Sequence, residues 1–447
     1  MKKSFFTYSV FLVLFLSIIG SIAFLSILKY HYEGGTKYQF LQKSVVFFAS
    51  IPMNVKKMIK YKTYNLDKVE ELVKHKKKER FKRFISTERN ALLILPRYDL
   101  SLNRSVVDIV NLDNFKVIHT YKHNIREMNN QIKNIKEFPR IKIDYSPQRF
   151  RYKHPLLFED GSLISMYGPV YKIDFCSNLL WINDQETFHH SQMLDYEGNI
   201  WIGGEMNPKS KYIKKFHIKD YADDSIIKIN TDGEILFNKS ITEILIENNI
   251  VADNFALNSS LSNLKSPIHL NDIEPALSNT KYWKQGDVFI NLRNQNSIIH
   301  YRPSNNEVIN YITGPFAQQH DVDIISDKEI SIFNNNNFYV NSSRSEILVY
   351  NFETKNFSKL FNTQLQNENF KTNTGGLSHT LKDGSLIVDE SNHGRIILFN
   401  NKGKKEWEFV NKDKNGNIGS IIWSRIIEDE LFVEKFKSLL KNKKCLN

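Results

Sequence analysis

The chain of 447 residues is 41% hydrophobic and 25% charged. This composition excludes a wholly disordered or collagen-like chain, and the length allows one large domain with a smaller appendage or two ordinary domains. The 31 phenylalanines and 20 tyrosines favour β-rich structure, because aromatic side chains pack well on pleated sheets. A formal net charge of +12 raises the question of nucleic-acid binding, which depends on where the charge lies.

The N-terminus predicts a membrane anchor. Residues 5–28 are uncharged and mostly apolar, and as a helix they would extend roughly 36 Å, which is enough to cross a bilayer. A cleaved signal peptide is the alternative, but the apolar run continues beyond its weak exit at residues 21–23, so we expect an uncleaved anchor over residues 1–30. Lys2 and Lys3 compete with Lys29 and the basic stretch beyond it, so charge alone leaves the orientation open.

A basic segment follows, and residues 31–90 are expected to form a helical linker. Leu66, Val69, Leu72 and Val73 recur at helical spacing, which predicts an amphipathic juxtamembrane helix whose basic side faces anionic lipid headgroups. A solvated charged helix explains the pattern equally well. The densest charge lies at Lys74, Lys76, Lys77, Lys78, Arg80, Lys82 and Arg83. The sequence has neither zinc-finger spacing nor an RNP-like motif nor basic-aromatic interleaving, which argues against sequence-specific nucleic-acid binding.

The chain has two cysteines, Cys176 and Cys445. Two are too few for a disulfide framework or for the four ligands of a structural zinc site. A single disulfide between them is left open by the sequence, because Cys176 follows a strand-like segment and Cys445 lies close to the C-terminus.

Beyond residue 90 the pattern changes to short apolar runs separated by turn signals, which predicts strands. Five turn pairs each precede a strand-like run, namely Asp160-Gly161, Glu197-Gly198, Asp232-Gly233, Asp383-Gly384 and Lys402-Gly403. Six units begin near residues 91, 154, 190, 269, 320 and 376, at spacings typical of propeller blades. We therefore expect an all-β, six-bladed β-propeller over residues 91–425 and a basic, helical C-terminal tail over residues 426–447.

Three histidines share a phase in this repeat. His190 and His320 each stand eight residues before a turn position, Gly198 or Lys328, and His269 begins a similar unit with a longer insertion. In a propeller the first strand of each blade lines the central channel, so side chains at one phase converge on one axis. A lone histidine is more often structural than catalytic, but three at one phase predict a site.

Five segments have an order and spacing that resemble the bacterial arylsulfotransferases of the six-bladed propeller type. They are Phe188-His189-His190-Ser191 through Gly198-Asn199-Ile200-Trp201, Pro267-Ile268-His269-Leu270-Asn271-Asp272-Ile273, Gly286-Asp287-Val288-Phe289-Ile290-Asn291-Leu292-Arg293-Asn294, Gly314-Pro315-Phe316 with Gln319-His320-Asp321-Val322, and His393-Gly394-Arg395-Ile396 leading to Trp407-Glu408-Phe409.

The resemblance implies transfer of a sulfuryl group from an aryl sulfate to a phenol without a cofactor. The chain agrees, because it has no G-x-x-x-x-G-K-[ST] loop for the phosphates of an adenylyl sulfate, and no metal site is expected. The resemblance also implies export, with the propeller on the periplasmic side of the cytoplasmic membrane.

The same resemblance assigns roles to residues. His320 is the nucleophile that forms a sulfohistidine, and Arg293 with His269 and Asn271 would donate to sulfate oxygens. His190 is the acid and base for the leaving and incoming phenols, with His189 as its neighbour at the substrate site.

Two other readings stay open. A non-catalytic, anchored propeller would bind an extracellular ligand or protein through its loops, for which the insertion at residues 253–283 and the asparagine run at residues 334–337 are suited. An aryl sulfate hydrolase would use the same histidines with water as acceptor. Neither the donor nor the acceptor is identified by the sequence.

Overall fold

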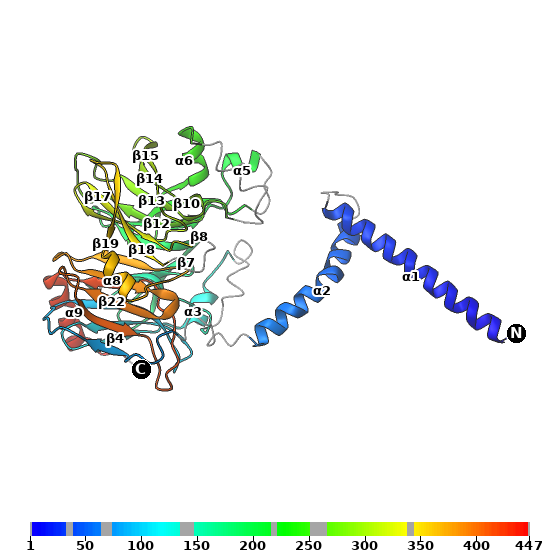
Figure 1. Cartoon of the computed structure of the whole chain (residues 1–447), viewed down its shortest axis with the longest axis horizontal. Helices are drawn as coiled ribbons and strands as arrows, with labels where there is room; N and C mark the ends of the chain where they lie inside the picture. Colours follow the sequence, from blue (N-terminus) through cyan, green and yellow to red (C-terminus); the bar gives the residue numbers. More distant parts are fainter. Residues whose placement is uncertain are drawn as a thin grey trace. The chain divides into compact units, whose positions relative to one another are not determined.

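A computed structural model of the chain describes residues 2–32, 39–63, 74–134, 147–215, 221–250, 266–337 and 344–445. The chain divides into two compact units, Met1–Val69 and Glu70–Asn447. The first unit is helical and the second is built almost entirely of strands (Figure 1).

The first unit contains two helices, α1 (Lys2–Tyr32) and α2 (Gln39–Thr63). Within α1 the span Tyr8–Tyr30 has a mean hydropathy of 2.7 and is long and apolar enough to cross a membrane. This is consistent with a single-pass membrane anchor. Helix α2 begins with apolar residues and ends with several lysines. The helix predicted from Leu66 to Val73 lies outside the described residues.

The second unit contains five antiparallel sheets, in each of which neighbouring strands are mostly consecutive in the chain. A seven-stranded sheet holds β5 (Lys153–Leu157), β6 (Leu163–Met166), β7 (Gly168–Ile173), β8 (Leu179–Leu194), β9 (Ile200–Glu205), β10 (Asp224–Ile229) and β11 (Ile235–Ser240). Two four-stranded sheets hold β12 (Leu270–Pro275), β13 (Val288–Leu292), β14 (Ser297–Arg302) and β15 (Glu307–Thr313), and β16 (Val322–Ser326), β17 (Glu329–Asn334), β18 (Glu346–Asn351) and β19 (Asn356–Leu360). A five-stranded sheet holds β20 (Leu377–Thr380), β21 (Leu386–Glu390), β22 (Arg395–Phe399), β23 (Lys405–Val410) and β1 (Phe81–Arg83).

The fifth sheet joins the two ends of the strand-rich unit. It holds β24 (Arg425–Ile427), β2 (Leu92–Asp99), β3 (Arg104–Asn111) and β4 (Lys116–Tyr121). Strand β24 pairs with β2 so that Ile427 lies opposite Leu92. Backbone hydrogen bonds between a late and an early strand therefore close the unit.

Apolar clusters fill the spaces between sheets. Leu92 and Val107 of the closing sheet pack with Leu163 and Tyr171, and other side chains of the same sheet pack against β21, β22 and β23. Further clusters join β9 and β10 to β12–β14, β13 and β14 to β17 and β18, and β17 and β18 to β21 and β22. Since each sheet packs against the next and the last against the first, the sheets form a propeller-like ring.

The strand-rich unit also contains short helices. They are α3 (Ile125–Asn130), α5 (Lys211–Lys215), α6 (Ile241–Glu247), η2 (Arg293–Gln295), α8 (Asn362–Asn367), η3 (Ser391–His393) and α9 (Glu430–Asn442). Helix α9 starts where the Asp429 side chain accepts from the Phe432 amide, and its Val433 and Phe436 are buried against Phe175. A disulfide between Cys176 and Cys445 ties the end of this C-terminal segment to the loop after β7.

The basic segment from Lys74 to Arg83 lies within residues 31–90, which the sequence predicts to be helical, but it is not a helix. It forms a turn followed by β1, which pairs with β23 so that Phe81 lies opposite Phe409. Phe81 also packs against Trp407. Three of its basic side chains bind groups farther along the chain. Lys78 binds Glu408, Lys74 binds Glu390, and Arg83 donates to the carbonyls of Leu112 and Asp113.

Candidate active site

His320 lies at the entrance of β16, where its backbone amide donates to the Phe333 carbonyl at 3.0 Å. Its Nδ1 atom is 2.9 Å from Oδ1 of Asn335, which follows β17 of the same hairpin. The Nδ2 of Asn335 donates to the carbonyls of Thr372 and Gly375 at 2.9 and 2.8 Å. Because both donors of the amide are engaged, its oxygen must accept, and the proton of His320 lies on Nδ1.

The second ring nitrogen of His320 keeps its lone pair. The Gly375 amide donates to Nε2 at 3.0 Å, which is compatible only with an unprotonated nitrogen. Burial lowers the pKa of His320 to about 3, although the hydrogen bond with Asn335 opposes the shift, and the positive charge of Arg293 lowers it further. At neutral pH the side chain is therefore an uncharged imidazole with a defined basic atom, Nε2.

His190 and His269 lie together beside His320. Their ring centroids are 4.9 Å apart. Burial lowers the pKa of His269 to about 4, against the attraction of Asp224, and burial also lowers the pKa of His190 well below its ordinary value. Both residues have left-handed backbones, with φ of 64° and 57°, at the entrance to the paired part of their strands. The structure thus brings the three phased histidines to one place.

Arg293 follows β13, and its backbone amide donates to the His269 carbonyl at 3.0 Å. Its guanidinium donates to two neutral oxygens, Oδ1 of Asn294 at 2.8 Å and Oε1 of Gln318 at 3.0 Å. Burial lowers the pKa of this guanidinium, which is still a cation because ordinary arginine titrates above pH 12. In the described part of the chain no carboxylate pairs with it, so a partly buried positive charge is left for an anion.

Asn271 and His189 have contacts of another kind. The Nδ2 of Asn271 donates to the Gln319 carbonyl at 2.8 Å and thereby links the strand after His269 to the residue before His320. The Oδ1 of Asn271 is buried without a hydrogen bond. His189 contacts His190 through Nδ1 and Asp224 through Nε2, so it lies behind His190.

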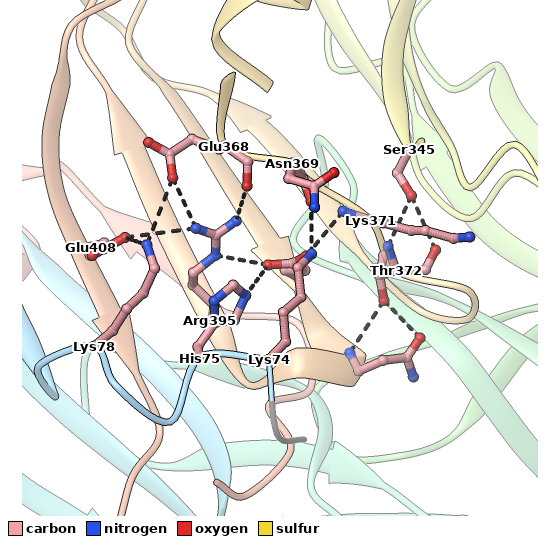
Figure 2. A network of polar contacts seen from close by, with 12 residues as sticks. Lys74, His75, Lys78, Ser345, Glu368, Asn369, Lys371, Thr372, Arg395 and Glu408 are labelled. Atoms are coloured by element: carbon pink, nitrogen blue, oxygen red, sulfur yellow. Dashed lines mark hydrogen bonds and ion pairs between the residues drawn. The ribbon is translucent and has the colours of Figure 1, made fainter. Parts of the chain in front are cut away.

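The loop that carries Gly375 is fixed by a buried carboxylate, Glu390. Its Oε1 accepts from the Lys371 amide at 3.0 Å, and its Oε2 contacts Nε2 of His75 at 2.8 Å and Nε of Arg395 at 2.7 Å. Figure 2 shows Lys74 and His75 reaching into this network beside Arg395, with Thr372 farther along the same loop. The segment that follows the N-terminal helices therefore supports the loop that meets His320.

The sequence did not point to Asn335, Gly375 or Asp224. Asn335 lies in the asparagine run that suggested a surface loop, yet the β16–β17 hairpin places it beside His320. The pairing of Val322 with Ile332 indicates this neighbourhood, so a hairpin register read from the sequence would have found it. Gly375 and Asp224 are distant in sequence from the histidines that they touch and carry no comparable signal.

Comparison with known proteins finds one family. The family model described as arylsulfotransferase (ASST) matches residues 154–412, which is more than half of the chain and includes His190, His269, Arg293 and His320. Among proteins of curated function, none is similar enough to match.

Several solved structures are similar to the chain. A protein of unknown function from Bacteroides caccae is 11% identical, with a TM-score of 0.47 over 74% of this chain and 98% of that one. TolB from Acinetobacter baumannii is 9% identical, with a TM-score of 0.43 over 76% and 67%. A catalytically inactive virginiamycin B lyase from Staphylococcus aureus with quinupristin is 12% identical, with a TM-score of 0.34 over 57% and 69%.

Proposed function

The chain belongs to the arylsulfotransferase family, and we propose that it transfers a sulfuryl group from an aryl sulfate to a phenol through a sulfohistidine on His320. The transfer requires no adenylyl-sulfate cofactor. The observation that carries the proposal is the state of His320, an uncharged ring whose proton is held on Nδ1 by Asn335 and whose Nε2 is the available nucleophile.

In the first half-reaction the sulfuryl group moves from the aryl sulfate to His320. Nε2 of His320 attacks the sulfur, the N–S bond forms, and the S–O bond to the aryl group breaks with its electron pair leaving on the aryl oxygen. The proton stays on Nδ1 of His320 and donates to Asn335 Oδ1, which stabilises the positive charge that the ring acquires. The Gly375 amide must leave Nε2 first, because one lone pair cannot accept a hydrogen bond and attack sulfur at once.

Arg293 and His269 are suited to stabilise the negative charge on the transferred sulfuryl group. Negative charge is shared by three sulfate oxygens in the transition state, so fixed donors and a cation are needed where it develops. The Arg293 guanidinium has only neutral acceptors and offers a planar fork of N–H donors. Asn271 positions the backbone between His269 and His320 and is less well placed to donate.

His190 serves as acid and base. Its protonated form gives a proton to a leaving phenolate of high basicity, and in the second half-reaction its neutral form takes the proton of the acceptor phenol. The phenol oxygen then attacks sulfur, and the N–S electron pair returns to Nε2 of His320. Both half-reactions use one site, so donor and acceptor bind in turn.

We also propose that the propeller has six blades. We interpret the seven-stranded sheet as two blades that share the long strand β8, which makes six blades in all. An apolar cluster between β6–β7 and β9–β10 supports this, because the two halves pack face against face as separate blades do.

We also propose that the propeller lies outside the cytoplasm, with α1 as an uncleaved single-pass anchor. The disulfide between Cys176 and Cys445 supports this location, because disulfides persist in oxidising compartments. Charge around α1 leaves the orientation undecided, so the disulfide is the main support from the chain itself.

Initial-rate kinetics with an aryl sulfate and a phenol test the mechanism. A covalent intermediate predicts parallel double-reciprocal plots, a burst of phenol from donor alone, and an added sulfuryl group on the peptide containing His320. The His320→Ala variant should lose burst and turnover, while His379→Ala, which removes a half-exposed histidine, should keep both. Intersecting plots with turnover in His320→Ala would reject the sulfohistidine, and equal turnover without a phenol acceptor would indicate a hydrolase.

A further inference from the structure

We propose that Asp224 is a positioning residue of this active site. Through His189 it sets the tautomer of His190 and leaves the Nε2 atom of His190 free to take the proton of the acceptor phenol. The inference rests on the proposed function, and it adds a residue and a role that the sequence motifs do not indicate.

The contact between His189 and His190 requires an irregular backbone. As consecutive residues of β8 they would point to opposite faces of a regular strand. Here His189 pairs with Gly203, the next paired residue is Gln192, and His190 has a left-handed φ of 64°. This bulge brings the rings together, with centroids 4.7 Å apart and the two Nδ1 atoms 2.6 Å apart. Backbone strain of this kind persists at functional sites, where it re-aims a side chain.

The neighbouring strand leaves room for the His189 ring. A Cβ at Gly203 would lie 2.8 Å from the His189 carbonyl oxygen and 3.5 Å from its Nδ1. The first of these distances is closer than a Cβ contact allows, so residue 203 must be glycine for the strands to approach. Part of the Gly203-Gly204 pair therefore serves the histidine contact.

Asp224, the first residue of β10, lies on the far side of His189. Its Oδ1 is 3.2 Å from Nε2 of His189, and its buried carboxylate is oriented through Oδ2, which accepts from the His269 amide at 2.9 Å and the Ser266 hydroxyl at 3.0 Å. This ion-pair contact brings a carboxylate oxygen, which has no proton to donate, against Nε2, so it favours the form of His189 with a proton on Nε2.

This placement determines the tautomer of His190. In the tautomer of His189 that carries its proton on Nε2, the Nδ1 atom is unprotonated. The 2.6 Å contact then requires a proton from Nδ1 of His190. The single proton of neutral His190 is thus on Nδ1, and its Nε2 holds the lone pair that a base needs.

The surroundings of His190 explain why a carboxylate is needed. Burial lowers the pKa of His190, and the neighbouring rings of His189 and His269 and the charge of Lys153 lower it further. His190 by itself would therefore bind a proton taken from phenol only weakly. Among the ion pairs of the described residues, the contact of His189 with Asp224 is the one that joins these histidines to a carboxylate. It stabilises the imidazolium of His190 through the hydrogen bond between His190 and His189 and the ion pair of His189 with Asp224.

The test is Asp224→Asn in the full-length protein, with the two half-reactions measured separately. An amide can donate to Nε2 of His189, which reverses both tautomers and leaves the base nitrogen of His190 protonated. The burst from 4-nitrophenyl sulfate should stay within about twofold, because that leaving group needs no acid, whereas transfer to phenol should fall about 100-fold. The deficit should shrink with acidic phenols that are already ionised. Asp223→Asn is the matched control, since the Asp223 carboxylate accepts from the Ser210 amide and the Ser240 hydroxyl, away from the histidines.

Failure of the inference is distinguishable from failure of the proposed function. A wild-type protein without a burst would reject the function itself. With a normal wild-type burst, an equal loss in both half-reactions of Asp224→Asn, or the same loss in Asp223→Asn, would overturn the role of Asp224. Nitrogen NMR of the 15N-histidine-labelled chain gives a readout that does not depend on activity. The proton should lie on Nδ1 of His190 in the wild type and on Nε2 in Asp224→Asn, and an unchanged tautomer would also overturn the inference.

Discussion

The state of His320 makes the first half-reaction insensitive to acid. Burial, with the positive charge of Arg293, places the pKa of this imidazole near 3 instead of at its ordinary value of about 6.5. The lowered pKa favours the neutral form, so nucleophilicity persists as pH falls and is lost only near pH 3. At pH 5 roughly 99% of the side chain keeps a free Nε2, whereas an ordinary histidine would keep about 3%.

A stopped-flow burst with 4-nitrophenyl sulfate measures this directly. The perturbation is a change of pH from 8 to 5, with single-turnover rates recorded at the isosbestic wavelength of 4-nitrophenol. We expect the burst rate to change less than about twofold, because the nucleophile stays neutral and the leaving group needs no proton. Tryptophan fluorescence at each pH is the control for unfolding. A fall of about 30-fold with a midpoint near pH 6.5 would refute this account of His320.

Other predictions concern stability and placement. Glu390→Gln should lower the free energy of unfolding by about 3–5 kcal/mol in denaturant titrations, since it removes the buried carboxylate shared by Arg395 and His75 and leaves Arg395 its pair with Glu368 and a longer one with Glu408. Lys435→Gln in an exposed ion pair should cost less than about 1 kcal/mol. An equal effect of the two substitutions would contradict the buried network. Cys176→Ser removes the link to Cys445, so it should lower the free energy of unfolding by about 2–5 kcal/mol. The melting temperature of this variant should not depend on added reductant. Protease added to intact spheroplasts should digest the propeller, and full protection would reject its placement outside the cytoplasm.

Much of the fold could be predicted from local pattern. The apolar run at residues 5–28 predicts a helix of membrane-spanning length, and α1 is that helix. Turn pairs such as Asp160-Gly161 and Asp383-Gly384 predict hairpins, because glycine tolerates the positive φ that these turns adopt. The segment from Lys74 to Arg83 lies in the linker that the sequence predicts to be helical, and there the prediction is wrong. Strand β1 pairs with β23, and basic side chains of the segment form ion pairs with carboxylates far along the chain.

The sequence by itself determined which residues share a repeat phase, and hence that His190 and His269 would lie near each other, because a repeat converts spacing along the chain into position around an axis. The tertiary structure decided what those rings contact. Asn335 orients His320 through a hairpin, Gly375 caps its Nε2 from another sheet, and Asp224 reaches His190 through His189. These contacts depend on strand register, a bulge and left-handed backbones. Such features arise from packing between segments distant in sequence, so no local pattern of residues specifies them.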